Sequence, residues 1–185
     1  MSIICVEQWF RDQFSYMDEY YIKGGKAFLY YFQGVPTIDM DIVITEKSCD
    51  TLFRDATSCW MGKWIQLDGY EPFEVVSMKE TKHTYKDKEG GKTVKHQVRT
   101  LFVNGMTLID AIIVKEIQPH EVELSEDGLY YMEKTAFVTD LMNTYEDRVK
   151  KCRYLNMYDE KSYSFFQKLE RTQARCIIAN SSYYQ

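Results

Sequence analysis

Two aspartates one residue apart, Asp39 and Asp41, interrupt the otherwise apolar segment TIDMDIVI at residues 37–44. Side chains alternate along a β-strand, so both carboxylates would point to one side of the strand while Ile38 and Met40 point to the other. Two carboxylates whose Cα atoms lie roughly 6.6 Å apart repel each other. A divalent cation is the simplest relief, because hard cations bind carboxylate oxygens. The spacing therefore predicts a metal-binding pair on a strand.

A third carboxylate, Asp110, lies in the segment MTLIDAIIV at residues 106–114, which is apolar on both faces. An ionised carboxylate in such surroundings is costly unless it is paired or binds a metal. Asp110 therefore joins Asp39 and Asp41 as a candidate metal ligand.

The hairpin before Asp110 offers a structural alternative. The pair Asn104-Gly105 between apolar runs predicts a type I′ turn, which needs positive φ at both positions. With a two-residue loop, Arg99 would face Asp110 across the hairpin. Asp110 could then form a salt bridge with Arg99, and the aspartate pair could lie at a solvated strand end.

Hydrophobic periodicity places these residues within an α+β pattern. Apolar residues at helical intervals predict helices over residues 6–20, 26–32, 48–67, 129–155 and 162–179. Alternating and turn-bounded runs predict strands over residues 20–23, 37–44, 74–86, 92–103 and 106–114. The chain thus ends in two helices that follow a β-rich part.

A glycine pair, Gly24-Gly25, stands after the apolar Ile22 and opens a predicted short helix. With the D-h-D strand and the later acidic strand, this order resembles the nucleotidyltransferase superfamily that includes DNA polymerase β and the poly(A) polymerases. The stretch GGKAFLYYFQGVPTIDMDIVI is most similar to two branches: poly(A) polymerase catalytic subunits of large DNA viruses, and abortive-infection type bacterial toxins. The resemblance covers about residues 20–114, with weaker similarity in the predicted helix 129–155.

The resemblance implies a transfer of a nucleoside monophosphate from an NTP, with ATP favoured, to an acceptor. Two ions, Mg²⁺ or Mn²⁺, would bind the attacking and leaving oxygens. Asp39 and Asp41 would bridge both ions, and Asp110 would hold the ion that activates the acceptor hydroxyl. The implied fold is a mixed β-sheet nucleotidyltransferase core packed by helices, as a single domain over 1–185, with its core at 1–118 and a C-terminal helical pair within 119–185.

The same resemblance implies a nucleotide site beside the acids. Glycine would let the backbone approach the triphosphate, and free N–H groups at the helix start would donate to it. Basic side chains on the C-terminal helices would add positive charge. The residues expected to bind nucleotide are Gly24, Gly25, Lys26, Thr37, Lys134 and Lys150.

Charge is distributed unevenly along the chain. A formal charge of −5 argues against a protein that coats nucleic acid. Residues 79–99, however, contain seven Lys or Arg against three Asp or Glu, and this basic hairpin favours RNA as the acceptor. The alternative is a solvated hairpin whose lysines discourage edge pairing. The residues expected to contact RNA are Lys86, Lys88, Lys92 and Lys95.

Two classes of function follow: an active nucleotidyltransferase, and a non-catalytic subunit of the same fold that binds a partner. The three acids favour the enzyme, because a module freed from catalysis has no reason to bear their repulsion and desolvation. For the enzyme, an RNA 3′ end is the favoured acceptor. Modification of a tRNA or a protein, as in the toxin-like branch, is the alternative.

The N-terminal apolar run stops at Val6, which is too short for a signal peptide, and no later run approaches the length of a membrane span. The five cysteines are scattered without a C-x-x-C pair, as in a protein with reduced thiols. We therefore expect a cytoplasmic protein without a membrane partner, in the host cytoplasm if it is viral.

Overall fold

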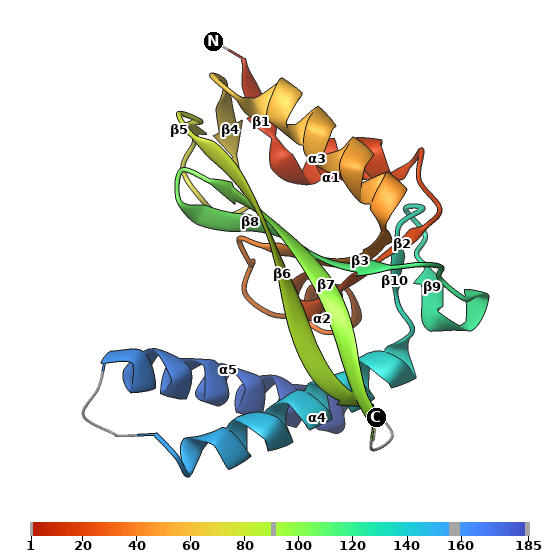
Figure 1. The fold of residues 1–185 in the computed structure, drawn as a ribbon, viewed down its shortest axis with the longest axis vertical. Coiled ribbons are helices and arrows are strands. Elements are labelled where there is room, and N and C mark those ends of the chain that lie inside the picture. The colour runs from red at the N-terminus through yellow and green to blue at the C-terminus, as the bar shows by residue number, and fades with distance from the viewer. Residues whose placement is uncertain (1, 90–91, 156–159, 184–185) are drawn as a thin grey trace.

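The protein is built on a mixed β-sheet with helices on both faces (Figure 1). The computed structural model describes residues 2–89, 92–155 and 160–183 and confirms the α+β expectation. Its strands are β1 (Ile3–Cys5), β2 (Tyr20–Lys23), β3 (Met40–Thr45), β4 (Trp64–Gln66), β5 (Phe73–Glu74), β6 (Met78–Glu89), β7 (Lys92–Val103), β8 (Met106–Val114), β9 (Val122–Leu124) and β10 (Tyr130–Met132). Its helices are α1 (Val6–Phe14), α2 (Gly24–Tyr31), α3 (Glu46–Trp60), α4 (Lys134–Cys152) and α5 (Glu160–Tyr183), with a 3₁₀ turn at Pro119–Glu121.

The main sheet brings together strands that are far apart in the sequence. Its order is β6-β7-β8-β3-β2-β10-β9, and a smaller sheet has the order β1-β4-β5. At its centre β3 runs antiparallel to β2 and parallel to β8. The segment with the aspartate pair and the segment with Asp110 are therefore direct neighbours.

The hairpin between β7 and β8 differs from the predicted register. Its turn at residues 104–105 has φ values of 49° and 80°, which confirms the type I′ expectation. An irregularity next to Leu101 then shifts the pairing by one residue. As a result Thr100 lies opposite Asp110, and the predicted pairing of Arg99 with Asp110 is wrong. A β-bulge inserts an extra residue into one strand, which a register counted from the loop does not include.

Alternation along β3 divides its side chains between two environments. Met40, Ile42 and Ile44 belong to the main core, which α1 and α3 cover. The side chain of Asp41 projects from the opposite face of the sheet. Its partner on β2, Lys23, forms an ion pair with Asp140 of α4 at 3.7 Å, so this face is directed toward the C-terminal helices.

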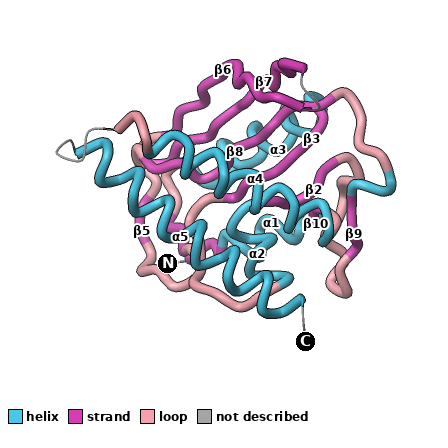
Figure 2. The backbone as a smooth tube through the Cα atoms, turned by 90° about the horizontal axis from the view of Figure 1, so that it is seen from below, coloured by secondary structure: helices cyan, strands magenta, loops and turns pink. Residues whose placement is uncertain are grey.

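The C-terminal helical pair, α4 and α5, crosses beneath the sheet (Figure 2). It is attached through a second core in which Phe28 of α2 and Phe32, directly after that helix, meet Phe137 of α4 and Ala179 of α5. Over the described part of the chain, no helix has both the length and the apolar character that crossing a membrane requires.

Several predicted boundaries move because pairing partners lie far away in the sequence. The predicted helix 6–20 ends at Phe14, and the predicted helix 48–67 ends at Trp60, after which Gly62 with φ +73° turns the chain into β4. The start of the predicted helix 129–155 is strand β10, which pairs with β2. The expected turn at the tip of the β6–β7 hairpin includes Gly90 and Gly91, which lie outside the described residues.

Candidate functional site

Asp41 and Asp110 are partners in register on the parallel strands β3 and β8. Neighbouring strands lie about 4.8 Å apart, and side chains at paired positions leave the same face. The pKa of Asp41 is raised to about 7, first by burial and then by the negative charges of Asp39 and Asp110. The positive charges of Lys23 and Arg175 act in the opposite direction. The three predicted acids therefore interact in one site.

Each carboxylate of this acidic site is held differently. Thr100 donates a hydrogen bond from Oγ1 to Oδ1 of Asp110 at 2.8 Å. Asp39 lies just before β3, although the sequence pattern placed it within the strand. As the side chains stand, no three His, Cys, Asp or Glu residues in the described ranges are grouped closely enough to hold a metal ion.

The donor set nevertheless fits a hard divalent cation. Oxygen ligands from carboxylates are those that Mg²⁺ and Mn²⁺ prefer. A cation between Asp41 and its two acidic neighbours would remove the repulsion that raises the pKa of Asp41. The backbone of β3 and β8 already brings Asp41 and Asp110 side by side.

Gly24 makes the closest backbone approach to these acids. Its φ is +63°, and a Cβ built on it would lie 2.2 Å from Oδ2 of Asp41, so only glycine fits there. Helix α2 begins at this residue, without a side-chain cap and without an acidic residue in its first turn. The first N–H groups of a helix have no intrahelical partner, so this helix start can receive an anion beside the acids.

Gly25, Lys26 and Thr37 contact one another away from Asp41. A Cβ on Gly25 would lie 2.5 Å from Cγ2 of Thr37. Lys26 donates from Nζ to the carbonyl of Thr37 at 3.0 Å and lies 3.7 Å from Glu7 of α1. Lys26 and Thr37 both line a cavity whose wall includes Ile22 and Met40 of the main core.

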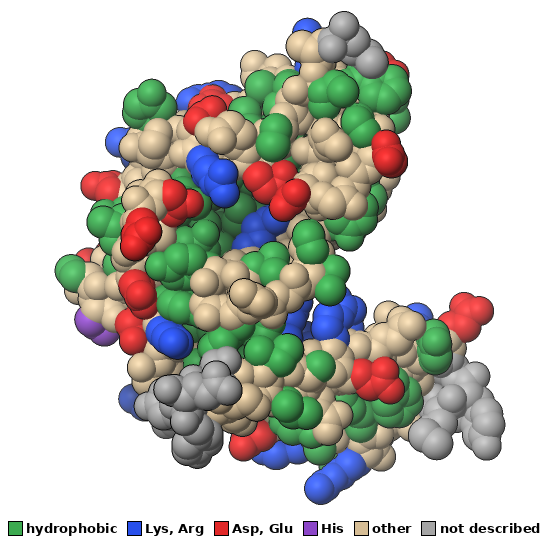
Figure 3. Space-filling model, turned by 180° about the vertical axis from the view of Figure 1, so that it is seen from behind, with side chains coloured by type: hydrophobic (Ala, Val, Ile, Leu, Met, Phe, Trp, Pro, Cys, Tyr) green, Lys and Arg blue, Asp and Glu red, His purple; other side chains and the backbone are tan. Residues whose placement is uncertain are grey.

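Basic residues of the C-terminal helices face the acidic site. The guanidinium of Arg175 lies over the ring of Phe28 at 5.4 Å and interacts electrostatically with Asp39 and Asp41. Burial, followed by the nearby charge of Arg171, lowers the pKa of Arg175. In the space-filling view, Lys and Arg side chains lie inside a hollow between the main body and the helical pair (Figure 3). Positive side chains therefore line part of this hollow.

The sequence analysis missed Arg175 and its neighbours. Arg171 and Arg175 are four residues apart on α5, and residues at this spacing lie on one helix face. Arg148 of α4 joins them by donating to Thr172 and to the carbonyl of Lys168. The spacing of Arg171 and Arg175 was the available signal in the sequence. Only the packing of α5 shows that this helix face is directed toward Asp39 and Asp41.

The two lysines expected at the nucleotide occupy the surface of α4. Lys134, at the start of the helix, lies over the ring of Phe32 at 5.7 Å. Lys150 is exposed in the last turn. The positions of Lys134 and Lys150 do not test whether these lysines bind nucleotide, so that role stays a prediction.

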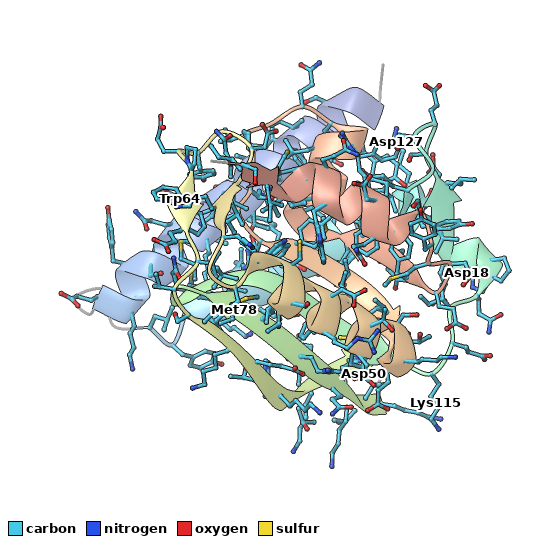
Figure 4. The ribbon with its side chains drawn as sticks, turned by 90° about the horizontal axis from the view of Figure 1, so that it is seen from above. Asp18, Asp50, Trp64, Met78, Lys115 and Asp127 are labelled. Carbon is cyan, nitrogen blue, oxygen red and sulfur yellow. The ribbon has the colours of Figure 1, made fainter. Side chains whose placement is uncertain are left out.

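Arg99 is a structural residue on the other face of β7. Its side chain forms ion pairs with Asp50 of α3 and with Glu80 of β6, and its guanidinium lies over the ring of Phe53 at 5.2 Å. Asp50 belongs to the part of α3 that crosses over the strands of the hairpin (Figure 4). Arg99 is only 4% exposed, so this network attaches α3 to the sheet.

The lysines of the β6–β7 hairpin are divided between its two faces. Lys86 and Lys95 are cross-strand partners on the face that carries Arg99, whereas Lys92 lies on the face that carries Thr100. Lys86, Lys92 and Lys95 are exposed. The side chain of Lys88 lies outside the described part of the structure.

Neither a family model nor a curated protein matches this sequence. Among solved structures, it is similar to the Megavirus polyadenylate synthase, with a TM-score of 0.54 and 10% sequence identity. The match covers 96% of this chain but 31% of the Megavirus protein, so the chain spans about a third of that protein's length. Over nearly its whole length, this chain therefore shares its fold with part of a viral polyadenylate synthase.

Proposed function

We propose that this chain is a metal-dependent nucleotidyltransferase that transfers a nucleoside monophosphate from an NTP to an RNA 3′ end. The observation that carries this proposal is the in-register placement of Asp41 beside Asp110, with the backbone of Gly24 against the Asp41 carboxylate. A purely structural pair of half-buried acids has no need of a left-handed glycine and a free helix start at the same point. The fold shared with a polyadenylate synthase supports the same reaction class.

In this proposal Asp39, Asp41 and Asp110 hold Mg²⁺ or Mn²⁺. When bound, such ions stabilise the charge that develops at the reacting phosphate and activate the attacking hydroxyl. Thr100 fixes one oxygen of Asp110 by its hydrogen bond and thereby orients the carboxylate. The other oxygen stays available to the reacting centre.

The nucleotide is bound from two sides. The N–H groups at the start of α2, behind Gly24 and Gly25, meet the triphosphate on one side. Arg175 and Arg171 of α5 meet it from the other, because guanidinium groups suit phosphate oxygens. In the transfer, a bond forms between the acceptor oxygen and the α-phosphorus, the bond from that phosphorus to the β-phosphate oxygen breaks, and pyrophosphate leaves.

RNA is the acceptor we favour, and ATP the nucleotide, because the structural neighbour is a polyadenylate synthase and the projecting hairpin is basic. Modification of a tRNA or protein is the second candidate. A non-catalytic subunit of the same fold is the third.

Labelling experiments separate these candidates. The protein is incubated with each of the four NTPs labelled at the α-phosphate, with Mg²⁺ or Mn²⁺, and with pooled RNA, tRNA and protein. We expect label from ATP to reach RNA 3′ ends, and Asp110→Asn to abolish this transfer. Label on tRNA bodies or on protein would support the second candidate. No label on any acceptor, together with measurable ATP binding, would overturn the enzyme and leave the non-catalytic subunit.

A further inference from the structure

A cavity of about 140 Å³ lies behind the glycine pair, on the core side of the sheet. Ile22 of β2 and Met40 of β3 line it, and these residues alternate with Lys23 and Asp41, which leave the opposite face. Phe10 of α1 contributes to its apolar wall. The wall formed by Ile22 and Met40 therefore lies on the face of the sheet opposite Asp41.

Two buried polar atoms, which belong to residues that line this cavity, lack hydrogen-bond partners within the described part of the chain. Oε1 of Glu7 accepts from the N–H of Asp68 at 3.0 Å and lies 3.7 Å from Nζ of Lys26. Within the described residues, buried Oε2 of the same carboxylate and buried Oγ1 of Thr37 have no partner. An unsatisfied buried polar group costs about 1–3 kcal/mol, so each of these atoms favours an occupant that supplies the missing hydrogen bond.

The walls restrict the chemistry of that occupant. A cavity of about 150 Å³ accommodates one benzene ring, and the apolar side of this cavity suits such a ring. Glu7 can only accept hydrogen bonds, so the occupant must donate. Lys26 already lies beside this carboxylate, which reduces the need for a second cation, and the carboxylate itself disfavours an anion.

We propose that this cavity binds a neutral one-ring molecule with an amino group, such as an amino-heterocycle. One N–H of the amino group donates to Oε2 of Glu7 and the other to Oγ1 of Thr37, while the ring packs against Phe10, Ile22 and Met40. The proposal does not depend on nucleotidyl transfer. Because Thr37 is two residues from Asp39 and contacts Gly25, an occupant touches the segments that lead to the acidic site.

A matched pair of probes tests the assignment. The protein is labelled with ¹³C at Ile and Met methyl groups and titrated with 2-aminopyrimidine or with 2-methylpyrimidine, which replaces the amino group by a methyl group. We expect 2-aminopyrimidine to shift the signals of Ile22 and Met40 and to bind at least about tenfold more tightly than 2-methylpyrimidine, since one lost hydrogen bond to a charged acceptor is of that order. Equal affinities would overturn the proposed recognition of an amino group.

Substitutions within the wall complete the test. Thr37→Val keeps the shape but removes the hydroxyl, so we expect it to reduce the preference for 2-aminopyrimidine. Glu7→Gln offers an amide N–H in place of a carboxylate oxygen, so we expect it to remove most of that preference. Unchanged preference in both folded variants would place the probe elsewhere and overturn the site. If neither probe shifts the cavity signals up to its solubility limit, the cavity holds water only and the proposal is wrong.

Discussion

Asp41 and Asp110 lie side by side because β3 and β8 are parallel neighbours in register, and the pKa of Asp41 is raised to about 7 in this position. A carboxyl group whose pKa is about 7 in the fold and 3.8 when unperturbed favours folding in its protonated form. Its contribution to stability is complete below about pH 4 and is lost as the pH rises through 7.

Asp41→Asn removes this pH dependence. In metal-free buffer at pH 8 we expect the variant to be more stable than the wild type by roughly 2–4 kcal/mol, at about 1.4 kcal/mol per pKa unit. Denaturant unfolding at pH 4.5 and pH 8 measures the difference, with exposed Asp12→Asn as the control. We also expect Mg²⁺ to stabilise the wild type at pH 8 and not the variant. A loss of stability in Asp41→Asn at pH 8 would show a structural role.

Gly24→Ala tests the close approach of the backbone to Asp41. A Cβ at this position would lie 2.2 Å from Oδ2 of Asp41, and φ is +63°. We expect a loss of about 1–2 kcal/mol from the backbone conformation alone, and a further loss from the displaced carboxylate. Gly62→Ala is the matched control, because its φ is +73° and an added Cβ meets nothing within 4 Å. Equal losses of stability with full transfer activity in Gly24→Ala would show that the close approach is not required.

Arg175 is the residue we expect to bind the triphosphate from α5. Arg175→Gln keeps most of the side chain but removes the charge that interacts with Asp39 and Asp41. We expect KM for the NTP to rise about ten- to hundredfold, as for the loss of a charged hydrogen bond. Arg54→Gln, at an exposed position of α3, is the control for a general charge effect. Steady-state kinetics with a short RNA acceptor provides the measurement, and an unchanged KM would exclude Arg175 from the nucleotide site.

Arg99 should matter for stability and not for chemistry. Arg99→Met leaves Glu80 and Asp50 without their buried partner. We expect the free energy of unfolding to fall by about 2–3 kcal/mol, below the upper range for buried ion pairs because Asp50 is 61% exposed at its side chain. Transfer activity per folded molecule should be retained. If the variant lost activity while it remained fully folded, Arg99 would have a role in the candidate site.

The positive charge of the β6–β7 hairpin predicts that RNA affinity depends on the salt concentration. Lys86→Gln with Lys95→Gln removes a cross-strand pair of positive charges. Each lost phosphate contact on a single strand lowers the slope of log affinity against log salt by about 0.7, so we expect a decrease of about 1.4. Lys47→Gln with Lys63→Gln is the control pair from the surface of the main body. An unchanged slope would leave the hairpin structural and shift our preference from RNA to a protein acceptor.

The sequence by itself determined the local elements and the identity of the acids. Strand β8 has the predicted bounds, and the turn at residues 104–105 has the predicted conformation, because alternation and turn chemistry act over a few residues. The sequence neighbours alone also identified Asp39, Asp41 and Asp110 as candidates, because a carboxylate inside an apolar segment is costly wherever that segment folds.

Only the tertiary structure decided which residues surround those acids. A bulge next to Leu101 placed Thr100, and not Arg99, opposite Asp110. The packing of α5 on α2 brought Arg175 to the site. Lys26 of α2 was brought to a cavity that Ile22 and Met40 of the core also line. Register and helix packing depend on contacts between distant segments, and a shift of one residue along a strand reverses the face that a side chain occupies.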